Sequence, residues 1–508
     1  MRLEFYMHYK KLLTIVVLLV GNFMFAQPAN TNHIDYSDTL VRIYNRVITV
    51  NDFIQRSEYT LRPRYCRGET GNDKKIILNS LIAEKLLAIE TQNDPRLIDD
   101  FTFQNFIQGR KEQIMRQILF QKEGVEKVVL DKKEISKLYS LVGRKYSVDY
   151  FSVEGAEESE KVEDSLADNT PFEKIFAAYY SHDSIPSKVI EWNPSDNSKI
   201  QSAIFSNSLK KGQIVGPIQT DSNYYMIIRI TGWTERVGIT DRDIRNRLDE
   251  VTEKLTMDYA VINYSNFVTG LMKGKNVEFE KETFAKLSVL AARHYFVSKE
   301  KKEDAFKELV LKDNPQESDG QIVYSFDESL QELDEEKFCT VDNKNWLVHD
   351  LRKEMSVHPL VFRKQKISKD EFPEQLKFAF ADLIRDKYLT EAAYINGYDT
   401  LPGVTHYTSN WEDASLALYK KGIILNEIKN GSADSDNNLY SFINNQIKKH
   451  SDNIEINTEL FNKISITGID LFALQTNVPY PVYVPSFPEL TNKNTLDYGK
   501  KLEMTYKN

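Results

Sequence analysis

The sequence predicts an α+β protein that is mostly helical and carries a small β-α-α-β domain between helical modules. Three observations predict this class. Apolar residues with helical spacing recur through residues 76–143. Near residue 145 the pattern changes to the alternation that is typical of strands. A strand-and-helix pattern from the start of the chain then returns after residue 340.

Composition indicates an ordinary globular protein. The chain has 508 residues, of which 41% are hydrophobic and 28% charged. The net charge of -9 argues against nucleic-acid partners, which bind to basic patches. Cys66 and Cys339 can either form a disulfide in an oxidising compartment or remain free thiols. We find no metal-binding or phosphate-binding motif, and therefore expect no metal and no cofactor.

Residues 1–26 have the pattern of a secretory signal peptide. A basic start with Arg2, Lys10 and Lys11 precedes an apolar run, Leu12–Val20, that is too short to span a bilayer comfortably. Nothing later in the chain approaches a membrane span. The sequence therefore predicts a soluble protein exported to the periplasm.

Residues 27–143 form the first predicted module. Alternating residues in 40–50 predict a hairpin, after which Asn51 or Asp52 can cap a helix. Helical periodicity then predicts helices at 76–92, 101–123 and 130–143.

Residues 144–236 form the small central domain. The segment "KYSVDYFSV" (145–153) predicts a strand, "PFEKIFAAYY" (171–180) a helix and "YYMIIRITGW" (224–233) a closing strand. Residues 237–300 then predict a charged helical connector.

A second module, 301–410, resembles the first. "NWLVHDL" (345–351) matches "VITVNDF" (47–53), and "LIRDKYL" (383–389) matches "LIAEKLL" (81–87) at nearly the same separation. The alternative, that two amphipathic helices are alike by chance, stays open. Residues 411–508 predict further helices and a strap with four prolines, "NVPYPVYVPSFPEL" (477–490), which we expect to be extended and on the surface.

The central domain contains short motifs in a distinctive order. "IEW" (190–192) is followed by "LKKGQIVGPIQTDSNYYMIIRI" (209–230), with a Leu-x-x-Gly, a Gly-Pro and a Thr turn. In this order the domain resembles the parvulin family of peptidyl-prolyl isomerases, in particular the periplasmic chaperones of the SurA and PpiC kind. The parvulin-like part covers less than a fifth of the chain, and the flanking helices resemble the body of such a chaperone.

The resemblance implies a site with two buried histidines, which this chain lacks. The first position falls on Asp149 or Tyr150, and the second on Tyr225, or on Met226 if the strand slips by one residue. The glycine-rich loop of the family is reduced to "SKVIEW" (187–192). The degenerate catalytic positions that we select are Asp149, Asp183, Thr220 and Tyr225. The candidates for binding the substrate proline are Trp192, Ile200, Ile204 and Phe205.

Plain structural roles compete with these assignments. Asp183 can simply be an acid at a helix end beside His182, and Thr220 can bond its own turn. Acidic residues that share helices with lysines are typical of solvated faces. Isomerisation of an X-Pro bond requires a site that binds the twisted amide best, and the loss of both histidines makes such activity doubtful.

The favoured hypothesis is therefore a periplasmic chaperone or assembly factor that binds unfolded, secreted or outer-membrane client polypeptides, with a parvulin-like domain of weak or absent activity. One alternative is an active peptidyl-prolyl cis-trans isomerase. Another is an accessory subunit docked through the strap on an outer-membrane barrel or a secretion complex.

Overall fold

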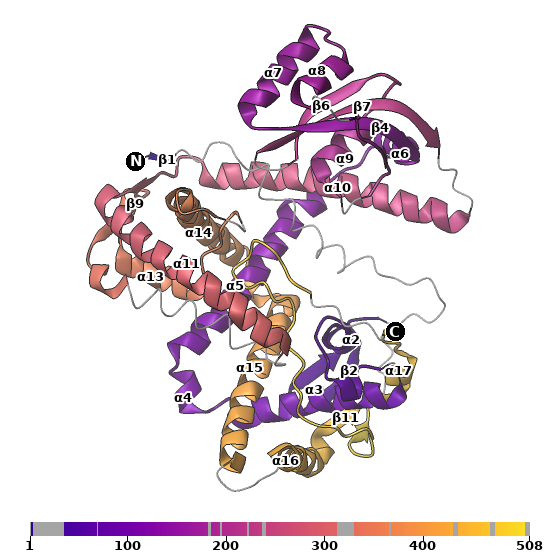
Figure 1. The fold of residues 1–508 in the computed structure, drawn as a ribbon. Helices are drawn as coiled ribbons and strands as arrows, with labels where there is room; N and C mark the ends of the chain where they lie inside the picture. The colour runs from indigo at the N-terminus through magenta and orange to yellow at the C-terminus, as the bar shows by residue number, and fades with distance from the viewer. Residues whose placement is uncertain are drawn as a thin grey trace. The chain divides into compact units, whose positions relative to one another are not determined.

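The computed structural model describes residues 2–3, 35–68, 70–180, 184–193, 196–220, 223–235, 240–311, 330–364, 367–429, 435–467 and 473–502. The fold is α+β and mainly helical, as the sequence predicts (Figure 1). The predicted signal peptide lies, except for residues 2–3, outside the described residues. Within the described part of the chain, no helix combines the length and the apolar character needed to cross a bilayer.

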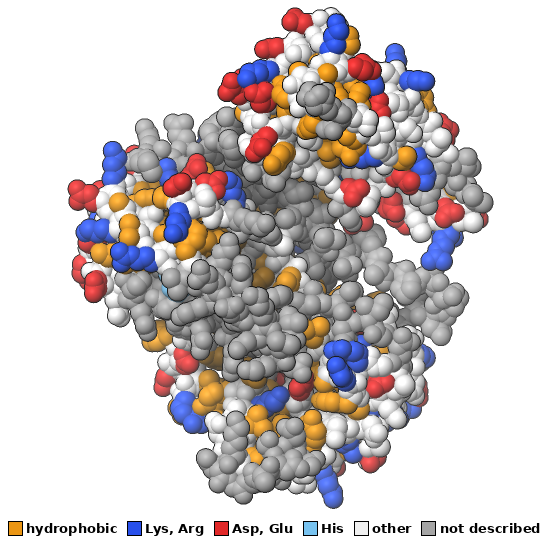
Figure 2. All heavy atoms as spheres, viewed as in Figure 1, with side chains coloured by type: hydrophobic (Ala, Val, Ile, Leu, Met, Phe, Trp, Pro, Cys, Tyr) orange, Lys and Arg blue, Asp and Glu red, His pale blue; other side chains and the backbone are white. Residues whose placement is uncertain are grey.

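The chain divides into two compact units. Unit 1 comprises residues 1–119 and 268–508, and unit 2 comprises residues 120–267. The face in Figure 2 shows basic and acidic side chains intermixed over the described surface of the chain. On this face the net negative charge is therefore not gathered in one patch.

Unit 2 is built on a four-stranded antiparallel sheet with strand order β5-β4-β7-β6 (Figure 1). The predicted β-α-α-β pattern corresponds to β4, α8, α9 and β7, and the structure adds α7 and an edge strand on each side. The elements are α6 (Lys132–Val142), β4 (Arg144–Glu154), α7 (Ala156–Ala167), α8 (Phe172–Tyr179), β5 (Ser187–Ile190), α9 (Ser198–Phe205), β6 (Ile214–Gln219), β7 (Tyr224–Glu235) and the first part of α10 (Asp241–Met272).

The sheet of unit 2 separates two apolar cores because successive side chains of a strand point to opposite faces. Face A is the side that packs α9, and it includes Tyr146, Val148 and Phe205. Face B is the side that packs α7 and α8, and it includes Phe151 and Ile227.

Gly216 allows β6 to approach β7 closely. Its φ is +114°, and an ideal Cβ built there lies 2.6 Å from the carbonyl oxygen of Met226. We expect Gly216→Ala to lower the free energy of unfolding of unit 2 by about 2 kcal/mol, because any Cβ adds both backbone strain and a backbone collision. Urea unfolding measures this loss. Gly232→Ala is the control, since no atom lies within 4 Å of its added Cβ; equal effects of the two changes would contradict the explanation.

Unit 1 contains two strand-helix modules of the same order. The first consists of β2 (Thr39–Ile43), β3 (Arg46–Thr49), α2 (Val50–Glu58) and α3 (Gly71–Thr91). The second consists of β9 (Lys337–Val341), β10 (Lys344–Leu347), α13 (Val348–Val357) and α14 (Phe372–Ile395). The matching sequences "LIAEKLL" and "LIRDKYL" lie in α3 and α14.

Equivalent backbone hydrogen bonds close both hairpins onto their helices. The N–H of Val50 donates to Asp38 O at 3.0 Å, and that of Val348 donates to Glu336 O at 3.0 Å. A third strand extends each sheet antiparallel to the first: β11 (Ile454–Ile456) pairs with β2, and β8 (Val277–Phe279) pairs with β9. The predicted connector 237–300 therefore also supplies a strand to the second module.

The remaining elements of unit 1 are mainly helices, with two short strands at the two ends of the chain. They are β1 (Arg2–Leu3), α4 (Pro95–Ile98), α5 (Phe101–Glu123, which continues into unit 2), α11 (Lys281–Leu311), α15 (Pro402–Lys429), α16 (Ser435–Lys449), α17 (Thr458–Lys463), β12 (Lys500–Lys501) and short 3-10 turns. Cys66 and Cys339 are both buried free thiols, and burial raises the pKa of Cys339 to about 12. Of the two alternatives for the cysteines, the structure therefore has free thiols.

Candidate functional site

Two of the predicted catalytic residues, Asp149 and Tyr225, lie on face B of the sheet of unit 2. Asp149 Oδ2 accepts a hydrogen bond from Arg229 Nη2 at 2.7 Å, and its Oδ1 accepts one from Ser187 Oγ at 2.7 Å. Burial alone would raise the pKa of Asp149, but the hydrogen bonds from Arg229 and Ser187 lower it below its usual value. Asp149 is thus the carboxylate of an ion pair, and Tyr225 packs against the apolar core of face B.

The predicted substrate-binding residues lie on face A instead. Trp192 and Phe205 meet there edge to face, with ring centroids 5.5 Å apart. Ile204 and Phe205 are 0% exposed, and they are therefore core residues that offer no surface to a ligand. Trp192 and Ile200 are half-buried against the same cluster. The sheet thus separates the proposed catalytic residues from the proposed binding residues, and the site selected from the sequence is not assembled.

Tyr150 and Met226, the alternative positions for the histidines, do share face A with Trp192 and Phe205. Both pack against the core of that face. In the strand register Tyr150 pairs with Ile228, and Ser152 with Met226. Tyr150 and Met226 are thus the alternatives that lie on the same face as the binding candidates, one residue from Asp149 and Tyr225 on each strand. A phenol and a thioether occupy this face, and the only histidine between residues 144 and 236 is His182, which lies outside the described residues.

Thr220 has the structural role of closing its own turn. Its N–H and its hydroxyl both donate to Tyr224 O, at 2.9 and 3.2 Å, and so close the turn between β6 and β7. Asp183 lies outside the described residues. None of the described candidates thus has the geometry of a general acid, a general base or a nucleophile facing a binding surface.

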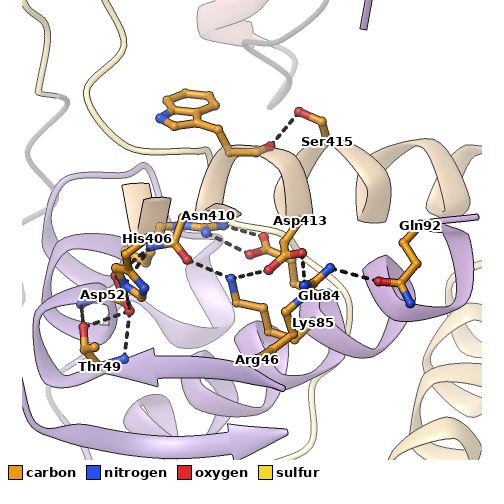
Figure 3. A network of polar contacts seen from close by, with 12 residues as sticks. Arg46, Thr49, Asp52, Glu84, Lys85, Gln92, His406, Asn410, Asp413 and Ser415 are labelled. Carbon is orange, nitrogen blue, oxygen red and sulfur yellow. Dashed lines mark hydrogen bonds and ion pairs between the residues drawn. The ribbon is translucent and has the colours of Figure 1, made fainter. Parts of the chain in front are cut away.

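A buried polar network joins the first module of unit 1 to α15 (Figure 3). Asp52 accepts hydrogen bonds from His406 Nε2 at 2.8 Å and from Asn410 Nδ2 at 2.8 Å. Lys85 Nζ contacts Asp413 Oδ2 at 2.9 Å, and Arg46 Nε lies 3.0 Å from Asp413 Oδ1. The network connects β3, α2 and α3 of the first module to the long helix α15.

Sequence reasoning missed this network. Glu84 and Lys85 have the acid-lysine pattern of a solvated helix face, yet they are only 1% and 4% exposed. Glu84 pairs with Arg56 at 2.6 Å inside the same core. The one available signal was that α3 is apolar on all sides around these residues, which indicates a helix surrounded by protein.

The network leaves too little space for a substrate. A cavity of ≈ 40 Å³ lies beside Asp52, Lys85 and Asn410, which is room for water-sized molecules. Among the described residues, no group of three or more His, Cys, Asp or Glu side chains could hold a metal ion. The arrangement is that of a structural support.

The pH dependence of Asp52 provides a test of this role. Burial alone would raise its pKa, but the hydrogen bond and charge of His406 lower it below the ordinary value of 3.8. A carboxylate with a lowered pKa stabilises the fold above its ordinary pKa, and this contribution is lost as the pH falls through the lowered value. We expect Asp52→Asn to lower the free energy of unfolding by about 2 kcal/mol near neutral pH, and by less at about pH 3.

Asp73→Asn is the matched control for that measurement. Asp73 occupies the same third position in a capping box, with Thr70, but it is only half-buried, whereas Asp52 is buried. Its substitution should cost about 1 kcal/mol or less. Urea unfolding curves at both pH values that show equal losses for the two variants would contradict a role for the His406 contact.

The strap (residues 477–490) is bound inside unit 1, and is not the surface segment that the sequence predicts. Tyr480, Tyr483 and Phe487 are buried. The segment is not extended throughout, because it bends at residues 477–479 and turns back so that Val482 pairs with Leu474. Side chains of other elements satisfy its backbone carbonyls. The donors are Gln113 Nε2 to Tyr480 O (2.9 Å), Arg110 Nη1 to Val482 O (2.7 Å) and Arg56 Nη2 to Ser486 O (2.7 Å).

No protein-family model matches the chain, and no curated protein matches it. Solved structures of PrsA proteins align with part of it. The peptidylprolyl isomerase PrsA from Bacillus cereus aligns at 16% identity over 47% of this chain and 93% of that chain, with a TM-score of 0.20. PrsA from Bacillus subtilis aligns at 17% identity over 46% and 93%, with a TM-score of 0.16. At these TM-scores the likeness establishes no shared fold, so function has to be inferred from this chain's own sequence and contacts.

Proposed function

We propose that the chain is an extracytoplasmic holding chaperone that binds unfolded polypeptides in extended form, and that its parvulin-like unit acts as a binding or spacing unit with weak or no isomerase activity. The clients are secreted or outer-membrane proteins before they fold, and the location is the periplasm. The signal-peptide pattern of residues 1–26 supports export, and the clients and the periplasmic location are part of this proposal.

The observation that carries this proposal is the way unit 1 holds its own strap. Arg56, Arg110 and Gln113 donate to main-chain carbonyls, which every polypeptide possesses. Apolar and aromatic side chains fill the space between these donors. Unit 1 therefore already binds one segment that has no helix or strand, in part through main-chain carbonyls.

Face A of the parvulin-like sheet supports binding over catalysis. Tyr150 and Met226, the alternatives to Asp149 and Tyr225 for the histidine positions that the resemblance implies, pack against the core of face A. Ile204 and Phe205 are fully buried in that core. Stabilising a twisted X-Pro amide requires polar groups at the reacting bond and an open apolar pocket for the ring. Ile204 and Phe205, two of the residues selected for the proline ring, are 0% exposed, so an active isomerase is the weaker alternative.

The burial of the strap also weakens the alternative of a docked accessory subunit. That hypothesis requires residues 479–488 to form an exposed docking surface. However, the side chains of Tyr480, Tyr483 and Phe487 are each at most 7% exposed. A partner would first have to extract them from the core of unit 1.

Suppression of aggregation tests the proposed function. A chemically unfolded protein without cysteines is diluted into buffer with the full chain at equal or twofold concentration, and light scattering follows its aggregation. A holding chaperone lowers the scattering in proportion to its own concentration, because each molecule occupies client surface. Scattering that equals that of a serum-albumin control would contradict the proposal.

A further inference from the structure

The third strands of the two modules in unit 1, β11 and β8, have the same pattern. Each strand has a buried apolar residue on either side of a glutamate: Ile454, Glu455 and Ile456 in β11, and Val277, Glu278 and Phe279 in β8. A helix begins two residues after each strand, α17 after β11 and α11 after β8. The side of each strand that faces away from its hairpin is therefore an equivalent sheet edge.

The outer edge of β8 consists of the backbone groups of Val277 and Phe279. β8 pairs antiparallel with β9, and the N–H of Glu280 donates to Phe338 O at 2.9 Å. The backbone groups of successive residues in a strand alternate in direction, so Glu278 also pairs toward β9. The N–H and C=O groups of Val277 and Phe279 therefore point away from β9, toward the position of a fourth strand.

In the first module a later segment of the chain occupies this position. β12 lies along β11, with Lys500 opposite Glu455. The contact continues beyond β12, because the N–H of Leu502 donates to Ile456 O at 3.0 Å. Leu502 is buried. The segment on β11 thus combines a basic residue opposite the glutamate with a buried leucine.

In the second module the fourth strand is β1. The register is antiparallel and places Arg2 opposite Glu278 and Leu3 opposite Val277. Residues that are directly opposite each other share one face of a sheet, and opposite charges at such positions stabilise the pair. Because Val277 is buried and Glu278 is exposed, the edge of β8 favours a segment in which a basic residue is followed by an apolar one.

We expect export to remove the segment that fills this edge. β1 belongs to residues 1–26, which have the pattern of a signal peptide, whereas β12 belongs to the C-terminal part of the chain. Residues 27–34, which follow the signal peptide, contain neither Lys nor Arg and do not match the pattern of β1. The position of β1 in the mature protein is therefore suited to a strand from another molecule.

We propose that the outer edge of β8 binds an extended segment of an unfolded client polypeptide as an added antiparallel strand, with a Lys or Arg of the client opposite Glu278 and an apolar residue opposite Val277. The inference rests on the proposed holding function and assigns it a binding edge and a sequence preference. In this mode of binding, main-chain hydrogen bonds supply affinity and side chains supply the preference. An edge strand can do this because its outward N–H and C=O groups are available for pairing.

Fluorescence polarisation with the mature chain, residues 27–508, tests the site. The buried apolar residues of the described chain begin at Leu40, so the mature chain retains all of them. The probe is a fluorescein-labelled ten-residue peptide of Ser and Thr with a central Arg-Leu pair, compared with the same peptide methylated at the Leu nitrogen. We expect methylation to weaken binding at least about tenfold, because it removes the hydrogen bond to Val277 and separates the strands. Equal affinity of the two peptides would overturn the proposal.

Charge reversal locates the binding. A peptide with a central Glu-Leu pair should bind the wild type about fivefold more weakly than the Arg-Leu peptide, and Glu278→Lys should reverse this preference. Glu455→Lys is the matched control, because it changes the equivalent residue of the first module, where β12 occupies the edge, and it should leave the preference unchanged. A preference that is the same in the wild type and in Glu278→Lys would show that β8 is not the site.

The unprocessed chain provides a second test that needs no substitution. Residues 1–508 keep β1 at the edge of β8, and a tethered strand competes at a high effective concentration. We expect the unprocessed chain to bind the Arg-Leu peptide at least about tenfold more weakly than the mature chain. Equal binding by the two chains would contradict a shared position for β1 and the client.

The outcomes separate this site from the function on which it rests. If the mature chain suppresses aggregation but neither methylation of the peptide nor Glu278→Lys changes binding, the assignment to β8 is wrong and the holding function stands. If the peptide binds at β8 but aggregation is not suppressed, the strand site stands and the holding function fails. If the chain does neither, both proposals fail.

Discussion

Asp413→Ala should destabilise unit 1 by about 3 to 5 kcal/mol, because it removes one partner of a buried ion pair. Asp413 is 1% exposed and faces two cations, Lys85 and Arg46. Its removal leaves Lys85, which is 4% exposed, buried without its charge partner. Only the contact of Lys85 Nζ with Asn410 Oδ1 at 2.8 Å remains. Urea unfolding followed by circular dichroism measures the loss.

A control and a rescue make this result specific. Glu427→Ala removes an exposed acid from the same helix and should change the free energy of unfolding by less than about 0.5 kcal/mol. Lys85→Met combined with Asp413→Leu removes both buried charges and should recover much of the stability, because apolar residues of similar size can replace a buried ion pair. A single variant Asp413→Ala that is as stable as Glu427→Ala would show that the pair is not a support of the fold.

Arg110→Ala should release the strap from unit 1. The guanidinium of Arg110 is stacked on Trp411, with Cζ 3.5 Å from the ring centroid, and donates to Val482 O at 2.7 Å. A buried cation–π contact and a charged hydrogen bond are each worth about 2 kcal/mol. Because the two contacts share one side chain, we expect a total loss of about 3 kcal/mol. Limited proteolysis should also produce new cleavage within residues 477–490.

Arg110→Lys and Arg96→Ala complete this experiment. Lysine keeps the positive charge but lacks the planar guanidinium group, which stacks on Trp411 and donates a hydrogen bond at the same time. We therefore expect Arg110→Lys to lower the free energy of unfolding by less than Arg110→Ala does. Arg96 is exposed at the surface, and its removal should leave the strap protected. If the strap stays resistant to protease in Arg110→Ala, then side-chain donors are not what holds it.

Local patterns predicted the elements of the fold well. Strand alternation located β4 and β7, and helical periodicity located α3, α5 and α6. The similarity of "LIAEKLL" to "LIRDKYL" indicated two modules, and both segments lie in the second helix of equivalent strand-helix units. These features depend on neighbouring residues, which a sequence displays directly.

The candidate site could not be predicted in the same way because it depends on the face to which each strand residue points. A shift of one residue exchanges the two faces of a strand. Asp149 and Tyr225 point to face B, whereas their chain neighbours Tyr150 and Met226 point to face A. The two faces are distinguished only by the helices that pack on them, α9 on face A and α8 on face B.

The burial of Lys85 and of the strap could not be predicted from the sequence, for a related reason. Lys85 becomes a core residue because Asp413 reaches it from a helix that lies more than three hundred residues away in the sequence. The prolines of residues 477–490 predict an extended segment, but the chain bends at 477–479 and turns back so that Val482 pairs with Leu474. The prolines do not indicate that the side chains of Gln113 and Arg110 donate hydrogen bonds to carbonyl groups of the strap. These hydrogen bonds allow the strap to be buried.

The central claim is that the chain binds unfolded polypeptide without catalysing prolyl isomerisation. The most direct test is the refolding of a protein whose slow phase is limited by an X-Pro bond, followed by fluorescence over a range of concentrations of the full chain. We predict that small amounts leave the slow phase unchanged, and that equimolar amounts delay refolding because the unfolded client is held. A slow phase that accelerates in proportion to catalytic amounts of the chain would contradict this account and identify a working isomerase.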